Sequence, residues 1–137
     1  MKKVFIDTSV FVRFLTKDDP KKFTDCQSFF EQVQAGKLRP YTSNIVFLEL
    51  HFVLHRLYDF PAVKVNQALE KILTLRNLTV IETTDTPQAL KWHEKWGIKY
   101  PDCLIATQAK KGVVLVTYDQ DFEKITTLNP KEPQELG

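Results

Sequence analysis

Four acidic residues stand where a folded chain could bring their carboxylates together. Asp7 follows the apolar run 4–6, Glu49 lies inside an apolar helical pattern, Asp102 follows a Tyr-Pro pair, and Asp119 comes shortly after the apolar run 113–116. Carboxylates at the ends of buried elements are costly unless a hard divalent cation neutralises them. The pattern therefore predicts a site for Mg²⁺ or Mn²⁺, which accept oxygen ligands and keep open positions for water and phosphate.

Three of these acids also have an ordinary structural explanation. Asp7 precedes Thr-Ser at a helix start, where Asp is a favoured amino-terminal cap. Asp102 lies in the first turn of a helix that Pro101 opens, and the helix dipole favours negative charge there. Asp119 suits a turn or a cap, and Asp121 competes for the same role. We prefer Asp119 because it lies nearer the end of the strand.

Glu49 is harder to explain without a partner, because its face of the helix is largely apolar. The alternatives are an ion pair with a base such as Arg13 or Arg56, or a partly open edge of the fold. A zinc site on the same helix is disfavoured, since His51 and His55 lack the His-Glu-x-x-His order and project roughly opposite Glu49.

The elements that must position these acids alternate along the chain. Short continuous apolar runs predict strands, and apolar residues at helical spacing after cap residues or proline predict helices. We expect strands at 2–6, 39–42, 78–81 and 113–116, a further edge strand at 125–128, and helices at 10–15, 20–36, 45–58, 61–75, 86–97 and 101–112. Such alternation favours an α/β fold with a parallel sheet covered on both faces, where sites lie at the carboxyl ends of strands.

Length and composition fit one globular domain. The chain has 137 residues, with 43% hydrophobic and 26% charged residues. We expect a single domain over residues 1–130 and a loose carboxyl-terminal tail over 131–137, which is polar and contains proline. No apolar run approaches the roughly 20 residues that span a bilayer, so a membrane role is not expected.

Charge and cysteine content constrain the setting. The formal net charge of +2 is too small to argue for nucleic-acid binding by itself, so any such function must rest on the local site. The amino terminus meets Asp7 before a signal-peptide apolar region can form. Cys26 and Cys103 are too few and too far apart for a disulfide framework. We therefore expect a reduced, cytoplasmic protein.

Four segments, taken together and in order, are similar to a known family. They read Ile-Asp-Thr-Ser at 6–9, Ser-Asn-Ile-Val-Phe-Leu-Glu-Leu at 43–50, Tyr-Pro-Asp-Cys-Leu-Ile-Ala-Thr at 100–107 and Leu-Val-Thr-Tyr-Asp-Gln-Asp-Phe at 115–122. Each segment is weak alone, but the set resembles PIN-domain ribonucleases, and more narrowly the VapC-type toxins of type II toxin-antitoxin modules. The resemblance covers residues 3 to about 130.

The resemblance implies a fold, a site and partners. The fold would be a three-layer α/β/α domain with a central parallel sheet of four or five short strands. Position 118 departs from the family pattern, because Tyr118 stands where Asn is frequent. The family would also bring a homodimer and a small antitoxin whose tail covers the active groove. The implied metal ligands are Asp7, Glu49, Asp102 and Asp119, supported by Thr8, Ser9, Thr117 and Asp121.

The resulting hypothesis is metal-dependent hydrolysis of RNA phosphodiester bonds, with the acids as ligands of Mg²⁺ or Mn²⁺. Arg13, Lys99 and Lys124 are candidates for contacts with backbone phosphates. The main alternative is a non-catalytic PIN-like module that binds RNA or protein without cutting. A phosphatase of the haloacid-dehalogenase class is disfavoured, because that class needs a second Asp where Ser9 stands.

Overall fold

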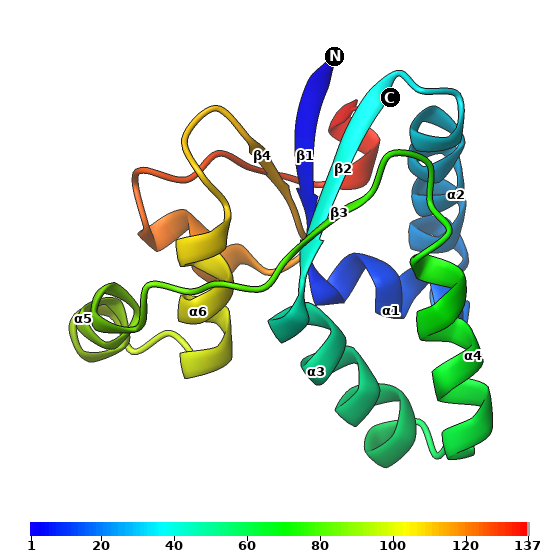
Figure 1. Ribbon diagram of the computed structural model, residues 1–137, viewed down its shortest axis with the longest axis horizontal. Helices are drawn as coiled ribbons and strands as arrows, with labels where there is room; N and C mark the ends of the chain where they lie inside the picture. Colours follow the sequence, from blue (N-terminus) through cyan, green and yellow to red (C-terminus); the bar gives the residue numbers. More distant parts are fainter. Residues whose placement is uncertain (137) are drawn as a thin grey trace.

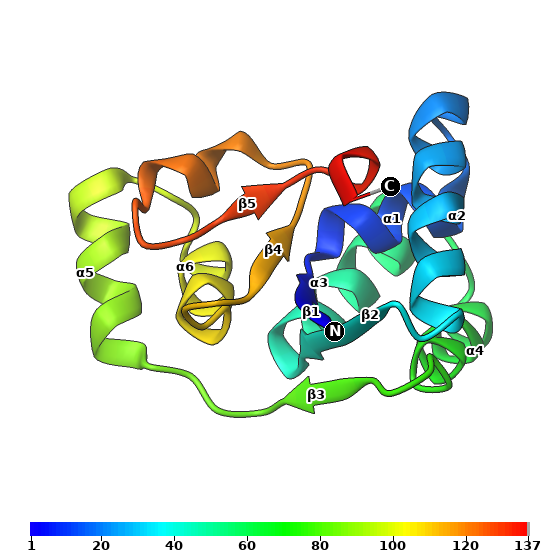
Figure 2. The ribbon, with the colours of Figure 1, turned by 90° about the horizontal axis from the view of Figure 1, so that it is seen from above.

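The fold is built around one parallel sheet of five short strands, described over residues 1–136 in a computed structural model. The order β3-β2-β1-β4-β5 is visible from above (Figure 2). Every neighbouring pair is parallel. The strands are β1 (Lys2–Ile6), β2 (Leu38–Ser43), β3 (Thr79–Ile81), β4 (Val114–Val116) and β5 (Pro130–Lys131).

Helices cover both faces of this sheet, as α5 and α6 lie on one side of it and α1, α2 and α4 on the other (Figure 1). The α-helices are α1 (Thr8–Thr16), α2 (Pro20–Gln34), α3 (Asn44–Phe52), α4 (Ala62–Ile72), α5 (Thr86–Trp96) and α6 (Tyr100–Gln108). Shorter turns are the π-helical η1 (Val53–Leu57) and the 3₁₀ segments η2 (Gln120–Lys124) and η3 (Pro133–Leu136). The expected three-layer α/β/α architecture is confirmed.

Helix starts follow local cap chemistry. The Asp19 carboxylate accepts a hydrogen bond from the Lys22 amide at 3.1 Å, and Pro20 is the first residue of α2. Ser43 caps α3 through the Val46 amide at 3.2 Å. Each of these cap residues directly precedes the first residue of its helix. Local sequence therefore sets where most elements begin.

The core lies between the sheet and the helices that cover it. Phe5 and Leu115, on neighbouring strands, are fully buried, as are Phe29 on α2 and Ile105 on α6. Burying one such side chain stabilises the fold by about 1.5–3 kcal/mol. This packing holds the carboxyl ends of β1 and β4 side by side.

The carboxyl-terminal part differs from expectation. Residues 125–128 were expected to form the edge strand, but β5 is Pro130–Lys131. Ile125 is buried instead as an anchor after η2, whereas pairing with β4 needs only backbone groups, such as the Thr117 amide donating to the Lys131 carbonyl at 2.9 Å. Nor is the segment 131–136 a loose tail, because β5 and η3 form there and Pro133 is buried. Gly137 lies outside the described residues.

The long helix expected over 45–58 also differs. Its regular part, α3, ends at Phe52, and the chain continues as the π-helical turn η1. The Tyr58 amide donates to the Val53 carbonyl at 3.1 Å, five residues earlier. Such turns are often found at functional sites. Among residues 1–136, every helix is too short or too polar to cross a membrane.

Candidate metal centre

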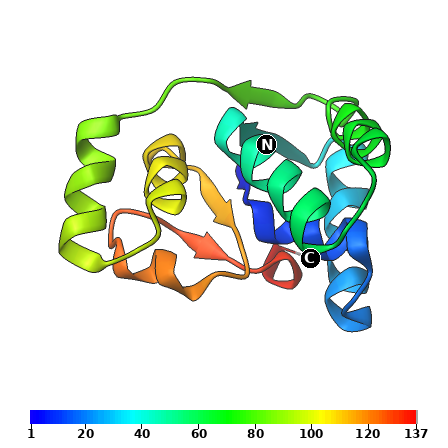
Figure 3. The ribbon, with the colours of Figure 1, turned by 90° about the horizontal axis from the view of Figure 1, so that it is seen from below.

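The carboxyl ends of β1 and β4 meet at the centre of the sheet, where the strand order reverses direction. Figure 3 looks onto this end of the sheet, with α1 in blue, α3 in teal and α6 in yellow around the strand ends. The Asp7 amide donates to the Val116 carbonyl at 3.0 Å, which ties the exit of β1 to β4. In open α/β sheets, ligands bind at such a crevice.

Three of the four expected acids form one tight cluster there. Asp7 follows β1, Glu49 projects from the middle of α3, and Asp102 lies in the first turn of α6. Each offers a carboxylate oxygen, and the three oxygens lie within 4.8 Å of one another. Oxygens that share one hard cation at about 2.0–2.6 Å must lie within roughly twice that distance of each other. The spacing therefore fits a shared divalent ion.

Asp7 is held in place on one side only. Its Oδ2 accepts hydrogen bonds from the Thr117 hydroxyl at 2.7 Å and the Ser9 hydroxyl at 2.9 Å. Its Oδ1 is buried and has no hydrogen-bond partner among residues 1–136. An unpartnered buried carboxylate oxygen is costly, and a cation would satisfy it. The donor set, made only of carboxylates, suits Mg²⁺ or Mn²⁺ rather than a soft metal.

Glu49 is oriented by a hydroxyl instead of a base. The Thr8 hydroxyl donates to Glu49 Oε1 at 2.8 Å. Arg13, a candidate ion-pair partner in the sequence, binds Asp18 at 3.0 Å instead. Within residues 1–136 neither Arg13 nor Arg56 forms an ion pair with Glu49. Among residues 1–136 Glu49 therefore has no salt-bridge partner, and the charge of Lys99 only partly offsets the burial that raises its pKa.

Burial and mutual repulsion make the cluster reluctant to ionise. Desolvation, then the nearby charges of Glu49, Asp7 and Asp119, raise the pKa of Asp102 to about 8. Burial also raises the pKa of Asp7, against the hydrogen bonds from Thr117 and Ser9, and it raises the pKa of Glu49 against the bond from Thr8. A divalent cation would offset this repulsion and favour the ionised forms.

Asp119 lies at the edge of this cluster. It is near enough to Asp102 to raise that residue's pKa, but it is not one of the three acids whose oxygens share the 4.8 Å spacing. Its Oδ1 accepts a hydrogen bond from the Asp121 amide at 2.9 Å, so it also caps η2. Asp121 lies farther out and pairs with Lys124 at 3.5 Å. Of the two acids, Asp119 is therefore the one that faces the cluster.

An open groove of about 410 Å³ gives access to the acids. Arg13 and Lys99, both expected from the sequence, line it, but Lys124 does not. Lys22 also lines the groove, and its Nζ lies 4.8 Å from the centre of the Tyr118 ring. No local signal in the sequence identified Lys22, because its place depends on how α2 packs beside α1. The groove is thus acidic at its base and basic at its rim.

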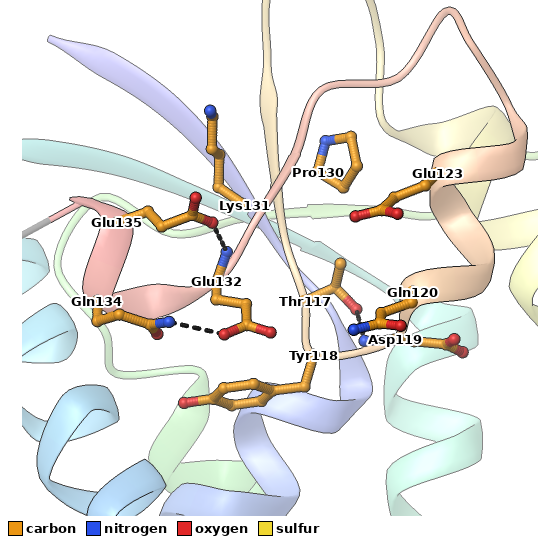
Figure 4. Close-up of a pocket in the computed structure, with 10 residues that line it drawn as sticks. All are labelled: Thr117, Tyr118, Asp119, Gln120, Glu123, Pro130, Lys131, Glu132, Gln134 and Glu135. Carbon is orange, nitrogen blue, oxygen red and sulfur yellow. Dashed lines mark hydrogen bonds between the residues drawn. The ribbon is translucent and has the colours of Figure 1, made fainter.

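A second pocket of about 280 Å³ lies on the other side of residues 117–119 (Figure 4). Its walls carry Glu123, Glu132 and Glu135 with a single Lys131. Glu135 accepts a hydrogen bond from the Glu132 amide at 2.7 Å, within the turn that contains η3. The walls of this pocket are acidic, whereas the groove over the cluster is also lined by Arg13, Lys22 and Lys99.

Comparison with known proteins places the chain in a family. The family model described as PIN domain matches residues 4–128. A VapC ribonuclease of Aquifex aeolicus is 27% identical over 131 residues, covering 93% of this chain and 96% of that protein.

Two solved structures, of VapBC2 from Rickettsia felis bound to a promoter DNA fragment and of VapBC-1 from nontypeable Haemophilus influenzae, share the fold. They are 19% and 18% identical, cover 95% and 96% of this chain and 98% of each solved chain, and have TM-scores of 0.68. The strand order, the acids at the sheet's carboxyl edge and the match over residues 4–128 agree with one another, and the chain belongs to the PIN domain family.

Proposed function

We propose that this protein is a divalent-metal-dependent ribonuclease that hydrolyses RNA phosphodiester bonds, and that it is the toxin of a toxin-antitoxin pair. The observation that carries the proposal is the cluster of Asp7, Glu49 and Asp102, with oxygens within 4.8 Å and an unpartnered Asp7 Oδ1. Membership of the PIN domain family and the similarity to a VapC ribonuclease support it.

Each acid has a distinct position in this proposal. Asp7, Glu49 and Asp102 would hold Mg²⁺ or Mn²⁺, with Asp119 as a further ligand or water contact at the edge. When bound, the ion supplies Lewis-acid polarisation of the phosphate and an activated water. Thr8 keeps the Glu49 carboxylate turned toward the cluster through its 2.8 Å hydrogen bond. Ser9 and Thr117 do the same for Asp7, and they serve as positioning residues.

The rim of the groove would bind the RNA backbone. Lys22 and Lys99 line the groove and form no ion pair among residues 1–136, so they can neutralise phosphates on either side of the scissile bond. Arg13 also lines the groove, but its guanidinium is already paired with Asp18. The Lys22 position beside the Tyr118 ring keeps its stem against the groove wall. Lys124 has no such place, since it lies outside the groove lining and pairs with Asp121.

The decisive experiment compares cleavage of single-stranded and stem-loop RNA with EDTA, Mg²⁺ or Mn²⁺. Wild type is expected to cleave only with metal, and Asp7→Asn and Glu49→Gln to lose at least about 100-fold in rate while keeping their circular dichroism spectra. Glu94→Gln, an exposed acid on α5, is the matched control and should cleave like wild type. Cleavage that survives in both cluster variants would point to a contaminating nuclease and refute the assignment.

The alternative is a non-catalytic PIN-like module that binds RNA or protein, and metal titration separates it from the enzyme. Calorimetric titration of wild type with Mn²⁺ should show binding that Asp7→Asn weakens strongly. Wild type that folds, binds RNA and shows neither metal binding nor cleavage would favour the module.

We also propose a cognate antitoxin and a homodimer. The antitoxin is supported by similarity to chains in solved VapBC complexes. The homodimer is supported by the exposed apolar side chains of Leu48, Phe52 and Leu57, which are 69%, 57% and 66% exposed. Light scattering should give a dimer for wild type and a monomer for Leu48→Glu with Phe52→Glu. A wild-type monomer at high concentration would refute the dimer.

A further inference from the structure

The edge of the sheet opposite the acids carries basic charge. The loops that lead into β1, β2, β3 and β4 lie at the top of Figure 1. Seven of the chain's 19 basic residues and none of its 17 acidic residues lie at this edge, in residues 1–3, 35–39, 74–79 and 109–113. The basic residues are all exposed: Lys2, Lys3, Lys37, Arg39, Arg76, Lys110 and Lys111.

A groove of about 540 Å³ lies along this edge, larger than the one over the acids. Its walls carry Lys2 and Lys3 from β1 and Lys110 and Lys111 from the loop before β4, and no acidic residue lines it. None of the four lysines forms an ion pair with any of residues 1–136. Four lysines without an ion-pair partner at the lining of one groove favour the approach of an anion.

A fixed amide forms part of the same wall. Gln108 is 1% exposed, and its Nε2 donates to Asn44 Oδ1 at 3.2 Å and to the Thr83 carbonyl at 3.1 Å. Both partners are acceptors, so the orientation of the amide is set, and Gln108 Oε1 is left without a donor among residues 1–136. This buried oxygen is an acceptor and offers nothing to a phosphate, so the attraction of the groove for an anion comes from its lysines.

Helix dipoles explain only part of this charge. Helices α2 and α6 end at this edge, and Lys37, Lys110 and Lys111 lie just beyond their last turns, where the helix dipole favours a cation only weakly. Lys2 and Lys3 lie on a strand and gain nothing from a helix end. Interaction with helix ends also does not explain why the four lysines line one groove.

We infer that this amino-edge groove, defined by Lys2, Lys3, Lys110 and Lys111, is a second contact surface for the phosphate backbone of single-stranded RNA. The inference rests on the proposed function in taking RNA as the polyanion. The groove lies at the opposite end of β1 from the acids, and five residues of strand span about 16 Å. RNA held there would remain bound away from the cleavage groove, so this surface would add affinity and favour longer substrates.

The test measures binding without cleavage. Labelled single-stranded RNA is titrated in EDTA with protein carrying Asp7→Asn, by fluorescence anisotropy, between about 50 and 300 mM KCl. The amino-edge variant changes Lys2, Lys3, Lys110 and Lys111 to Gln. The control variant changes four exposed lysines of α4 and α5 to Gln: Lys64, Lys71, Lys91 and Lys95. These four substitutions remove the same amount of charge.

The amino-edge variant is expected to lose about 10-fold or more in affinity near 100 mM salt. Its slope of log affinity against log salt should shrink by about 0.7 for each lysine that contacts a phosphate. Equal losses of RNA affinity in both variants, or no loss in either, would overturn the inference. A second protein carries the four amino-edge Lys→Gln changes but keeps Asp7. It should cleave a short RNA at the wild-type rate with metal, which separates failure of this surface from failure of the nuclease.

Discussion

Replacing Asp102 with Asn should remove a pH-dependent loss of stability from the metal-free protein. Burial and three neighbouring acids raise the pKa of Asp102 to about 8 in the folded state, against 3.8 in an unfolded chain. A group whose pKa is raised by folding contributes stability that is fully present below its unfolded pKa and is lost as the pH rises through its folded pKa. For Asp102 that window runs from about 4 to about 8.

The magnitude follows from the width of the window. One proton held in the folded state and released in the unfolded state costs about 1.4 kcal/mol of stability per pH unit. Between pH 5 and pH 8, wild type in EDTA should therefore lose up to about 4 kcal/mol of unfolding free energy through Asp102. The pKa of Asp18, lowered to about 2 mainly by the hydrogen bond from Tyr58, leaves this range unaffected.

The assay is urea denaturation in EDTA at four pH values. The difference between wild type and Asp102→Asn reports Asp102 together with its repulsion of Asp7 and Glu49, and Glu94→Gln serves as the exposed control that should follow wild type. Saturating Mn²⁺ should flatten the wild-type pH dependence, because a bound cation keeps the carboxylates ionised. Parallel curves for wild type and Asp102→Asn across this range would refute the reasoning.

Three further substitutions test the supports of the cluster and the core. Thr8→Val removes the 2.8 Å hydrogen bond to Glu49 and should weaken Mn²⁺ binding about 10- to 100-fold by calorimetry. Ser9→Ala removes the 2.9 Å hydrogen bond to Asp7 and should lower the unfolding free energy by about 1–3 kcal/mol in urea. Phe122→Ala removes a fully buried side chain of η2 and should cost about 3–5 kcal/mol by the same measurement, with cleavage retained in the folded fraction.

The parts of the fold that local chemistry determines were predictable from the sequence. Cap residues such as Asp19 and Ser43 mark helix starts, and the strands expected at 2–6 and 113–116 contain β1 and β4. The final strand lies elsewhere than the apolar pattern predicts, because the hydrogen bonds that pair it with β4 join backbone groups, which any residue carries. The residues of β5, Pro130 and Lys131, show no apolar pattern, whereas the apolar Ile125 is buried directly after η2 and outside any strand.

The site was partly predictable for a related reason. An acid inside an apolar helix costs free energy in isolation, so Glu49 indicates a partner before any fold is known. Asp7 is less informative, because it also caps α1 by accepting a hydrogen bond from the Ser9 amide at 3.4 Å. The basic residues at the rim of the groove have no comparable desolvation cost, because a lysine can be solvated at almost any surface position. Lys22 therefore enters the groove and Lys124 stays outside it through the packing of whole helices, which no local pattern encodes.

The fold also explains how it tolerates so many acids at one edge. Helices α1, α3 and α6 begin near the carboxyl ends of the strands, and their amino ends carry partial positive charge toward the cluster. Each such end offsets about 0.3–1 kcal/mol, far less than the repulsion that raises the pKa of Asp102 to about 8. The remainder must be met by protons or by a cation. Since the three acids come from elements far apart in sequence, this cost exists only in the folded state, and a metal that relieves it binds and stabilises the fold in one step.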